Sequence, residues 1–118
     1  ISVASLDIRS YLAENAAYRV YSTKKQAAGK LAVTHVRVLK RRPKTTLLEV
    51  RLETGRKHQI RVHLAERGYP IIGDTTYGTR SNPLRRLALH GARLEFRHPG
   101  DDRKMQFESP YPRVFDSL

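Results

Sequence analysis

The 118-residue sequence contains no cysteine and no tryptophan, and it has a single methionine. Without cysteine, the chain can form neither a disulfide framework nor a thiolate metal site. No apolar run approaches the roughly 18 residues of a membrane-spanning helix, and the first residues do not form a basic segment followed by an apolar one. We therefore expect no membrane partner and no signal peptide, and we expect a cytoplasmic location.

Acidic residues are scarce. The 11 Asp and Glu residues stand against 23 Lys and Arg residues, which gives a net charge of +12 and a pI near 10.6. This excess favours a polyanionic partner such as RNA, although charge that only keeps the protein in solution is the plain alternative. The length and the 39% hydrophobic content suit one domain or part of one. Because the chain starts at Ile1 rather than Met, we expect residues 1–118 to be a single partial domain.

Hydrophobic periodicity predicts an α+β fold, mainly antiparallel hairpins and sheet with one principal helix. Residues 31–39 alternate between two faces, and the face carrying Ala32, Thr34, Val36 and Val38 is expected to be buried. A basic turn at 40–44 and a returning strand at 45–54 complete a hairpin. A turn at 98–102 is expected to join a strand that includes Phe96 to a strand at 104–108.

The other elements are predicted from shorter signals. Residues 7–15 are expected to form a short helix, and residues 18–23 are expected to form a strand. The main helix is predicted from about residue 56 to residue 66, with Gly68 ending it. A loop follows at 70–78, and residues 83–89 are predicted to be a helical or irregular crossing.

The most informative segment is TGRKHQIRVH at residues 54–63, followed by PIIGDTTYG at residues 70–78. The first segment places several hydrogen-bond donors near the start of a helix, which favours an anion or a carboxylate. His58 and His63 are five residues apart and lack the spacing of a helical metal pair, so we expect no metal and two hydrogen-bonded structural histidines. Asp74 is expected to accept hydrogen bonds from nearby backbone N–H groups.

Several blocks of the sequence resemble, in the same order, the RluA-type RNA pseudouridine synthases. The blocks are residues 29–39, 54–63, 70–78, 89–94, 96–99 and 107–110, so the resemblance covers about residues 29–112. One departure is Val36, where an aromatic residue is common. The resemblance implies the C-terminal part of a catalytic domain that isomerises uridine to pseudouridine in rRNA or tRNA, without a metal or organic cofactor.

The resemblance also implies a nucleophilic aspartate in an Arg-Leu-Asp segment and a tyrosine, both upstream of the matched blocks. No aspartate in this sequence stands in that context, and Tyr11 lies too near the block at 29–39 to match the tyrosine. We therefore expect both groups to lie outside this chain and the chain alone to be inactive. Arg61 matches the family's active-site arginine, whose guanidinium would hold the nucleophile ionised; alternatively, it is an exposed helix arginine. In this chain we expect Arg61 to lack a carboxylate partner.

The remaining candidate residues are assigned to RNA contacts. The basic residues expected to reach phosphates are Arg56, Lys57, Arg80, Arg85 and Arg86, and for Lys57 a simple solvated charge is the alternative. Tyr77 and Leu89 are the candidates for a pocket around the target base, with a role in the hydrophobic core as the alternative for each.

Two other functional classes are compatible with the composition. A non-catalytic basic RNA-binding module would use the same cations only to hold RNA. A small basic ribosome-associated structural protein is a third class, which the ordered motifs disfavour. An Arg-Leu-Asp segment upstream in the open reading frame would distinguish the enzyme from both.

Overall fold

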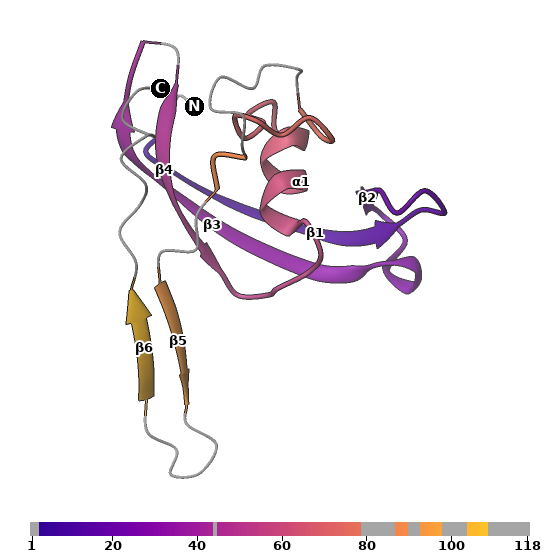
Figure 1. Ribbon diagram of the computed structural model, residues 1–118. Helices are drawn as coiled ribbons and strands as arrows, with labels where there is room; N and C mark the ends of the chain where they lie inside the picture. Colours follow the sequence, from indigo (N-terminus) through magenta and orange to yellow (C-terminus); the bar gives the residue numbers. More distant parts are fainter. Residues whose placement is uncertain (1–2, 44, 79–86, 90–92, 98–103, 109–118) are drawn as a thin grey trace.

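The computed structural model describes residues 3–43, 45–78, 87–89, 93–97 and 104–108, and its main body is a four-stranded antiparallel sheet with one helix against it (Figure 1). The strands are β1 (Ser5–Glu14), β2 (Val20–Thr23), β3 (Lys30–Arg41) and β4 (Thr46–Leu52), in the order β2-β1-β3-β4. A 3-10 turn, η1 (Gln26–Ala28), precedes β3, and the helix is α1 (Gln59–Glu66). A separate two-stranded antiparallel sheet pairs β5 (Arg93–Arg97) with β6 (Lys104–Glu108). The predicted α+β class is confirmed.

The prediction of a helix at residues 7–15 is wrong, because residues 7–14 lie within strand β1. The strand pairs with β3 from Ser5 to Leu12 and with β2 from Tyr11 to Glu14. Ile8 and Leu12 are buried on the side that faces the core, while Asp7 and Arg9 are exposed. This alternation has the period of a strand, and two flanking partners satisfy the backbone groups, so tertiary pairing outweighs the local helical preference.

The other predictions for the sheet hold where the structure describes the chain. Strand β2 lies within the predicted segment 18–23, and β3 and β4 form the predicted hairpin across the basic turn. On β3 the side chains of Ala32, Thr34 and Val36 are buried, as alternation predicted, whereas Val38, also predicted to be buried, is only half-buried. The β5–β6 hairpin is also confirmed. The predicted turn at 98–102 and most of the crossing at 83–89 lie outside the described residues.

The core lies between the sheet and helix α1. One group of buried side chains comprises Leu12, Val20, Ala32 and Val62, and a second comprises Ile8, Val36 and Leu64. The helix has only eight residues, which is too short for stability in isolation, so its packing against the sheet must hold it. No helix within the described ranges is long and apolar enough to cross a membrane.

Helix α1 begins later and ends where predicted. Its first residue is Gln59, because His58 has a left-handed backbone (φ 53°) that interrupts the helical run. Arg56 and Lys57 therefore lie in the loop before the helix, and their predicted place in its first turn is wrong. At the other end Gly68 has φ 84°, and Tyr69 N–H donates to Leu64 O at 2.9 Å. A glycine in this conformation is a common helix terminator.

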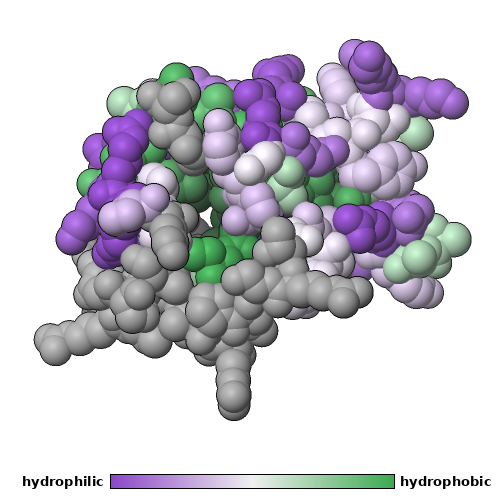
Figure 2. Space-filling model, turned by 90° about the horizontal axis from the view of Figure 1, so that it is seen from above, coloured by the Kyte–Doolittle hydropathy of each residue, from purple (hydrophilic) through white to green (hydrophobic). Residues whose placement is uncertain are grey.

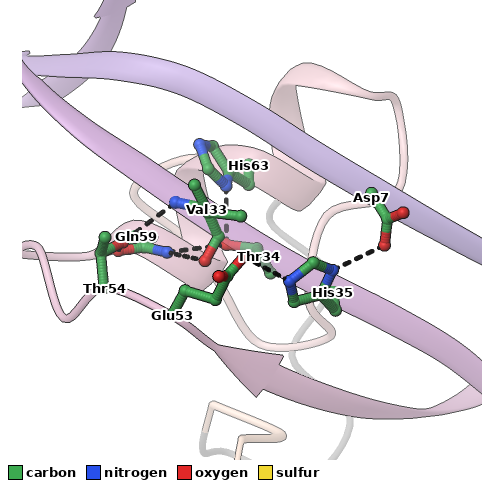
Figure 3. Close-up of polar contacts among 8 residues, drawn as sticks. All are labelled: Asp7, Val33, Thr34, His35, Glu53, Thr54, Gln59 and His63. Atoms are coloured by element: carbon green, nitrogen blue, oxygen red, sulfur yellow. Dashed lines mark hydrogen bonds and ion pairs between the residues drawn. The ribbon is translucent and has the colours of Figure 1, made fainter.

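On the opposite face of the sheet, His35 links three segments of the chain (Figure 3). Its Nδ1 lies 2.7 Å from Asp7 Oδ1 on β1, and its Nε2 lies 2.6 Å from Glu53 Oε2 just after β4. Both ring nitrogens can donate only in the protonated imidazole. Hydrogen bonding to Asp7, and then to Glu53, raises the pKa of His35 above its ordinary value of 6.5.

The His35 contacts predict a pH dependence of stability. A raised pKa in the folded state contributes stability that is fully present below about pH 6.5 and is lost as pH rises through the folded-state pKa. The excess unfolding free energy of the wild type over His35→Gln, measured in urea, should therefore be larger near pH 6 than near pH 9. Burial lowers the pKa of His63, so His63 changes the unfolding free energy with pH in the opposite direction. Because His63 is present in both proteins, its contribution cancels in the difference. A difference that grows with pH would contradict the assignment.

Candidate active site

The loop that leads into helix α1 is organised by the side-chain amide of Gln59, which is 2% exposed (Figure 3). Its Oε1 accepts from Thr54 Oγ1 at 2.7 Å and from Arg56 N–H at 3.0 Å. Its Nε2 donates to Val33 O at 3.0 Å and to Thr34 Oγ1 at 2.9 Å. These four bonds match the capacity of a carboxamide. Gln59 therefore fixes the start of α1 against strand β3.

A second buried polar group, His63, holds the middle of the helix to the sheet. Its Nδ1 lies 2.7 Å from Thr34 Oγ1, and its Nε2 lies 2.8 Å from Ser10 Oγ. The hydroxyls of Ser10 and Ser22 are 2.9 Å apart, and Ser22 donates to Glu66 at the end of α1. Burial lowers the pKa of His63, which favours the neutral ring. The prediction of a hydrogen-bonded structural histidine is confirmed.

Between these two anchors, helix α1 presents Arg61 to the 70–78 loop, where Asp74 receives it. Arg61 Nε donates to Asp74 Oδ2 at 3.1 Å, and Arg61 Nη2 donates to Asp74 Oδ1 at 3.0 Å. The Arg61 side chain is 20% exposed, whereas that of Asp74 is fully buried. The expectation that Arg61 lacks a carboxylate in this chain is wrong, because the neighbouring motif supplies one.

The surroundings of Asp74 keep it ionised. Burial alone would raise its pKa, but the hydrogen bond from Arg61 and those from the Tyr77 and Thr76 N–H groups together hold the pKa below its ordinary value. Asp74 Oδ1 accepts from Thr76 N–H at 3.2 Å and from Tyr77 N–H at 3.1 Å. The predicted bonds from Asp74 to nearby backbone are confirmed. Hydrogen bonding to Asp74 raises the pKa of Arg61 in turn.

Tyr77 connects this loop to the core and to His58. Its hydroxyl accepts from Val20 N–H at 3.1 Å and lies 2.7 Å from His58 Nδ1. The ring packs against the core group around Leu12, and the Arg61 guanidinium carbon lies 5.2 Å from its centroid. Burial, followed by the charges of Arg61 and Lys57, lowers the pKa of His58, so a neutral His58 can accept from the tyrosine. These contacts fit the core role of Tyr77; stacking on a base stays a prediction.

The 70–78 loop has no room for a side chain at Gly78. A Cβ placed there would lie 2.7 Å from Asp74 O and 2.8 Å from Pro70 Cβ. Gly78→Ala should therefore lower the unfolding free energy by about 1–3 kcal/mol, as overpacking does. Gly55→Ala is the matched control, since a Cβ at Gly55 meets nothing within 4 Å and its φ is not left-handed. Urea unfolding of both variants measures the effect, and equal stabilities would refute this account of the loop.

The structure describes two of the five residues predicted to contact phosphates, Arg56 and Lys57. Arg56 is exposed, but its Nε donates to Leu31 O at 2.9 Å, and Lys57 Nζ lies 3.0 Å from Glu14 Oε1. Leu89 is half-buried, and its neighbour Ala88 donates to Ile72 O in the 70–78 loop. The remaining predicted contacts, Arg80, Arg85 and Arg86, lie outside the described residues. On the face seen in Figure 2, hydrophilic side chains cover much of the described surface, with hydrophobic groups between them.

Sequence reasoning singled out Arg61 and Asp74 but did not join them, and it missed Gln59 altogether. The sequence did contain a signal for the Arg61–Asp74 pair, because the two residues have opposite charges and their motifs, at 54–63 and 70–78, are separated by a short connection. For Gln59 the signal was weaker, because an uncharged polar residue between Lys57 and Arg61 reads as another exposed helix position. Among the described residues no group of three or more His, Asp or Glu side chains is arranged to hold a metal ion.

Comparison with known proteins places this chain in a family. Residues 2–66 match the family model described as RNA pseudouridylate synthase. The chain is 46% identical over 102 residues to the ribosomal large subunit pseudouridine synthase D of Pseudomonas aeruginosa, covering 75% of this chain and 32% of that protein.

Two further relatives extend the comparison. The chain is 45% identical over 92 residues to the uncharacterized RNA pseudouridine synthase YhcT of Bacillus subtilis, covering 76% of this chain and 30% of that protein. It is 50% identical over 86 residues to an uncharacterized RNA pseudouridine synthase of Chloroflexus aurantiacus, covering 71% of this chain and 27% of that protein. The chain thus spans about a third or less of the length of these relatives. It belongs to the RNA pseudouridylate synthase family.

Proposed function

We propose that this chain supplies the arginine side of the active site in an enzyme that isomerises uridine to pseudouridine in structured RNA. The observation that carries the proposal is the position of Arg61. This residue lies on a helix fixed to the sheet, and the buried carboxylate of Asp74 holds its side chain in one orientation. A guanidinium aligned in this way is suited to hold a second carboxylate ionised and oriented for attack.

The Arg61 guanidinium has capacity for a second carboxylate. It carries five N–H donors, and Asp74 takes two of them, so three remain after that pairing. The side chain also keeps 20% of its surface exposed. Asp74 itself is a poor nucleophile, because it is fully buried and both oxygens accept hydrogen bonds from Arg61. The nucleophile is therefore assigned to an aspartate outside this chain.

Ribosomal RNA is the preferred substrate within this proposal. Four relatives are named ribosomal large subunit pseudouridine synthase D, and they come from Pseudomonas aeruginosa, Pasteurella multocida, Neisseria meningitidis and Haemophilus influenzae. The net charge of +12 suits a polyanion of that kind. Transfer RNA remains the second substrate to test.

A tritium-release assay tests the proposed function. RNA labelled at carbon 5 of uridine loses tritium when the base is rejoined to the ribose through that carbon. The longest open reading frame that includes this chain should release tritium from unmodified large-subunit rRNA, whereas the 118-residue chain alone should release none. Turnover by the chain alone would show that its nucleophile has been misassigned. Binding of rRNA without turnover by the longer protein would favour a non-catalytic RNA-binding module.

A further inference from the structure

The turn between β1 and β2 displays an exposed aromatic side chain in a strained, hydrogen-bonded setting. Tyr18 is 73% exposed and has a left-handed backbone with φ 62°. The side chain of Asn15 shapes the turn, since its Oδ1 accepts from Ala17 N–H at 2.9 Å and from Arg19 N–H at 3.0 Å. Tyr18 N–H also donates to Asn15 O at 3.0 Å. The turn thus holds Tyr18 in a backbone conformation that is unfavourable for most residues other than glycine.

This turn adjoins both segments that build the Arg61 site. Lys57 Nζ, from the loop before α1, lies 5.6 Å from the centroid of the Tyr18 ring. Arg19 donates to Thr76 O at 2.8 Å in the 70–78 loop, and its guanidinium carbon lies 5.1 Å from the Tyr77 ring centroid. Tyr77 also contacts Arg61. Tyr18 and its two cationic neighbours therefore lie on the same side of the molecule as the site.

From Tyr18 in this position the folded chain gains one cation–π contact with Lys57, made on an exposed ring. A largely exposed ring contributes little to the hydrophobic core, and a left-handed backbone is unfavourable for a residue with a Cβ. An exposed aromatic ring flanked by cations has the composition of sites that bind single-stranded nucleic acid. In such sites bases stack on the rings and cations follow the phosphates.

We propose that Tyr18 is a stacking platform for an unpaired RNA base beside the target uridine. The base packs on the exposed Tyr18 ring. The cations assigned to the flanking phosphates are Lys57, which pairs with Glu14 in the free protein, and Arg19, which donates one N–H to Thr76 O. The substrate class implied is RNA whose target lies in a loop or single-stranded segment, since paired bases cannot offer a free face. This inference rests on the proposed function, because it takes the Arg61 site to be the place where RNA is modified.

The chain offers a clean reporter for this contact. It contains no tryptophan, so Tyr18→Trp carries a single indole at the stacking position. Short oligouridylate should quench its fluorescence, whereas inorganic polyphosphate, which has charge but no bases, should not. Tyr69→Trp is the matched control, because Tyr69 is exposed (39%) but lies beyond the end of α1. Equal quenching by polyphosphate, or equal quenching of both variants by oligouridylate, would overturn the proposal.

Affinity supplies an independent readout. Tyr18→Ala should weaken oligouridylate binding by about 5- to 100-fold, the range expected for one stacked base, while Tyr18→Phe should bind like the wild type. Polyphosphate binding should change in neither variant. Unchanged oligouridylate affinity in Tyr18→Ala would refute the platform. If Tyr18→Ala bound oligouridylate normally while the longer wild-type protein released tritium, only this inference would fail. If the longer wild-type protein released no tritium although oligouridylate still quenched Tyr18→Trp, the proposed function would fail instead.

Discussion

Replacing Arg61 with lysine in the longer protein should lower pseudouridine formation by about 100-fold or more, the usual loss when a positioned active-site donor is removed. Lysine keeps the positive charge, but its three N–H donors point from a single nitrogen atom and cannot reproduce the planar fork that would hold Asp74 at two points and orient a nucleophile as well. Single-turnover tritium release measures the chemical step, and a binding assay with the same RNA separates that step from affinity. We expect the loss in the rate and little change in affinity.

Arg67→Lys is the matched control for that experiment. Arg67 follows the last residue of the same helix and is exposed, so its substitution changes a similar side chain without touching the Asp74 contact. Its turnover should stay near the wild-type value. If Arg61→Lys and Arg67→Lys turned over equally well, Arg61 would have no special part in the chemistry, and the helix would serve only as a basic surface.

Removing the charge of Arg61 should have the largest effect on stability. Arg61→Met leaves the carboxylate of Asp74 fully buried without its cationic partner, which should lower the unfolding free energy by about 3–5 kcal/mol. The double variant Arg61→Met/Asp74→Asn should recover about 1–2 kcal/mol of that loss. Asparagine carries no charge, and its oxygen can still accept from the Thr76 and Tyr77 N–H groups.

Urea unfolding of the wild type, both single variants and the double variant completes this cycle. The two substitutions should couple strongly, since the side chains are in direct contact. A double variant less stable than Arg61→Met alone would show that the penalty does not arise from an unpaired Asp74.

Much of the sheet was predictable because residues with buried and exposed side chains alternate along its strands, and the sequence shows this alternation directly. Strand β3 shows this best, with Ala32, Thr34 and Val36 buried as expected. Strand β1 was predicted wrongly, since a run such as SYLAE also suits a helix. Its identity depends on pairing with β3, whose partner residues lie 18 or more positions away in sequence. Local patterns carry no information about such a partner.

Sequence reasoning singled out Arg61 and Asp74, but it gave neither their mutual contact nor the part played by Gln59. The motif around Arg61 identified the arginine, and the glycine-bounded loop identified Asp74 as a residue bonded to backbone. Their mutual contact depends on how the chain leaves α1 at Gly68 and returns through the 70–78 loop. Likewise, the burial of Gln59 depends on Thr34 and Val33 from a strand more than 20 residues earlier.

The brevity of helix α1 has a consequence for how the molecule opens. Eight residues cannot remain helical without the sheet beneath them, so fluctuations that release α1 should also expose the buried face of β3. Amide hydrogens of Val62 and Val36 should then exchange with solvent as one cooperative unit. Any carboxylate that binds Arg61 would slow the exchange of both, so occupation of Arg61 would stabilise the sheet as a whole.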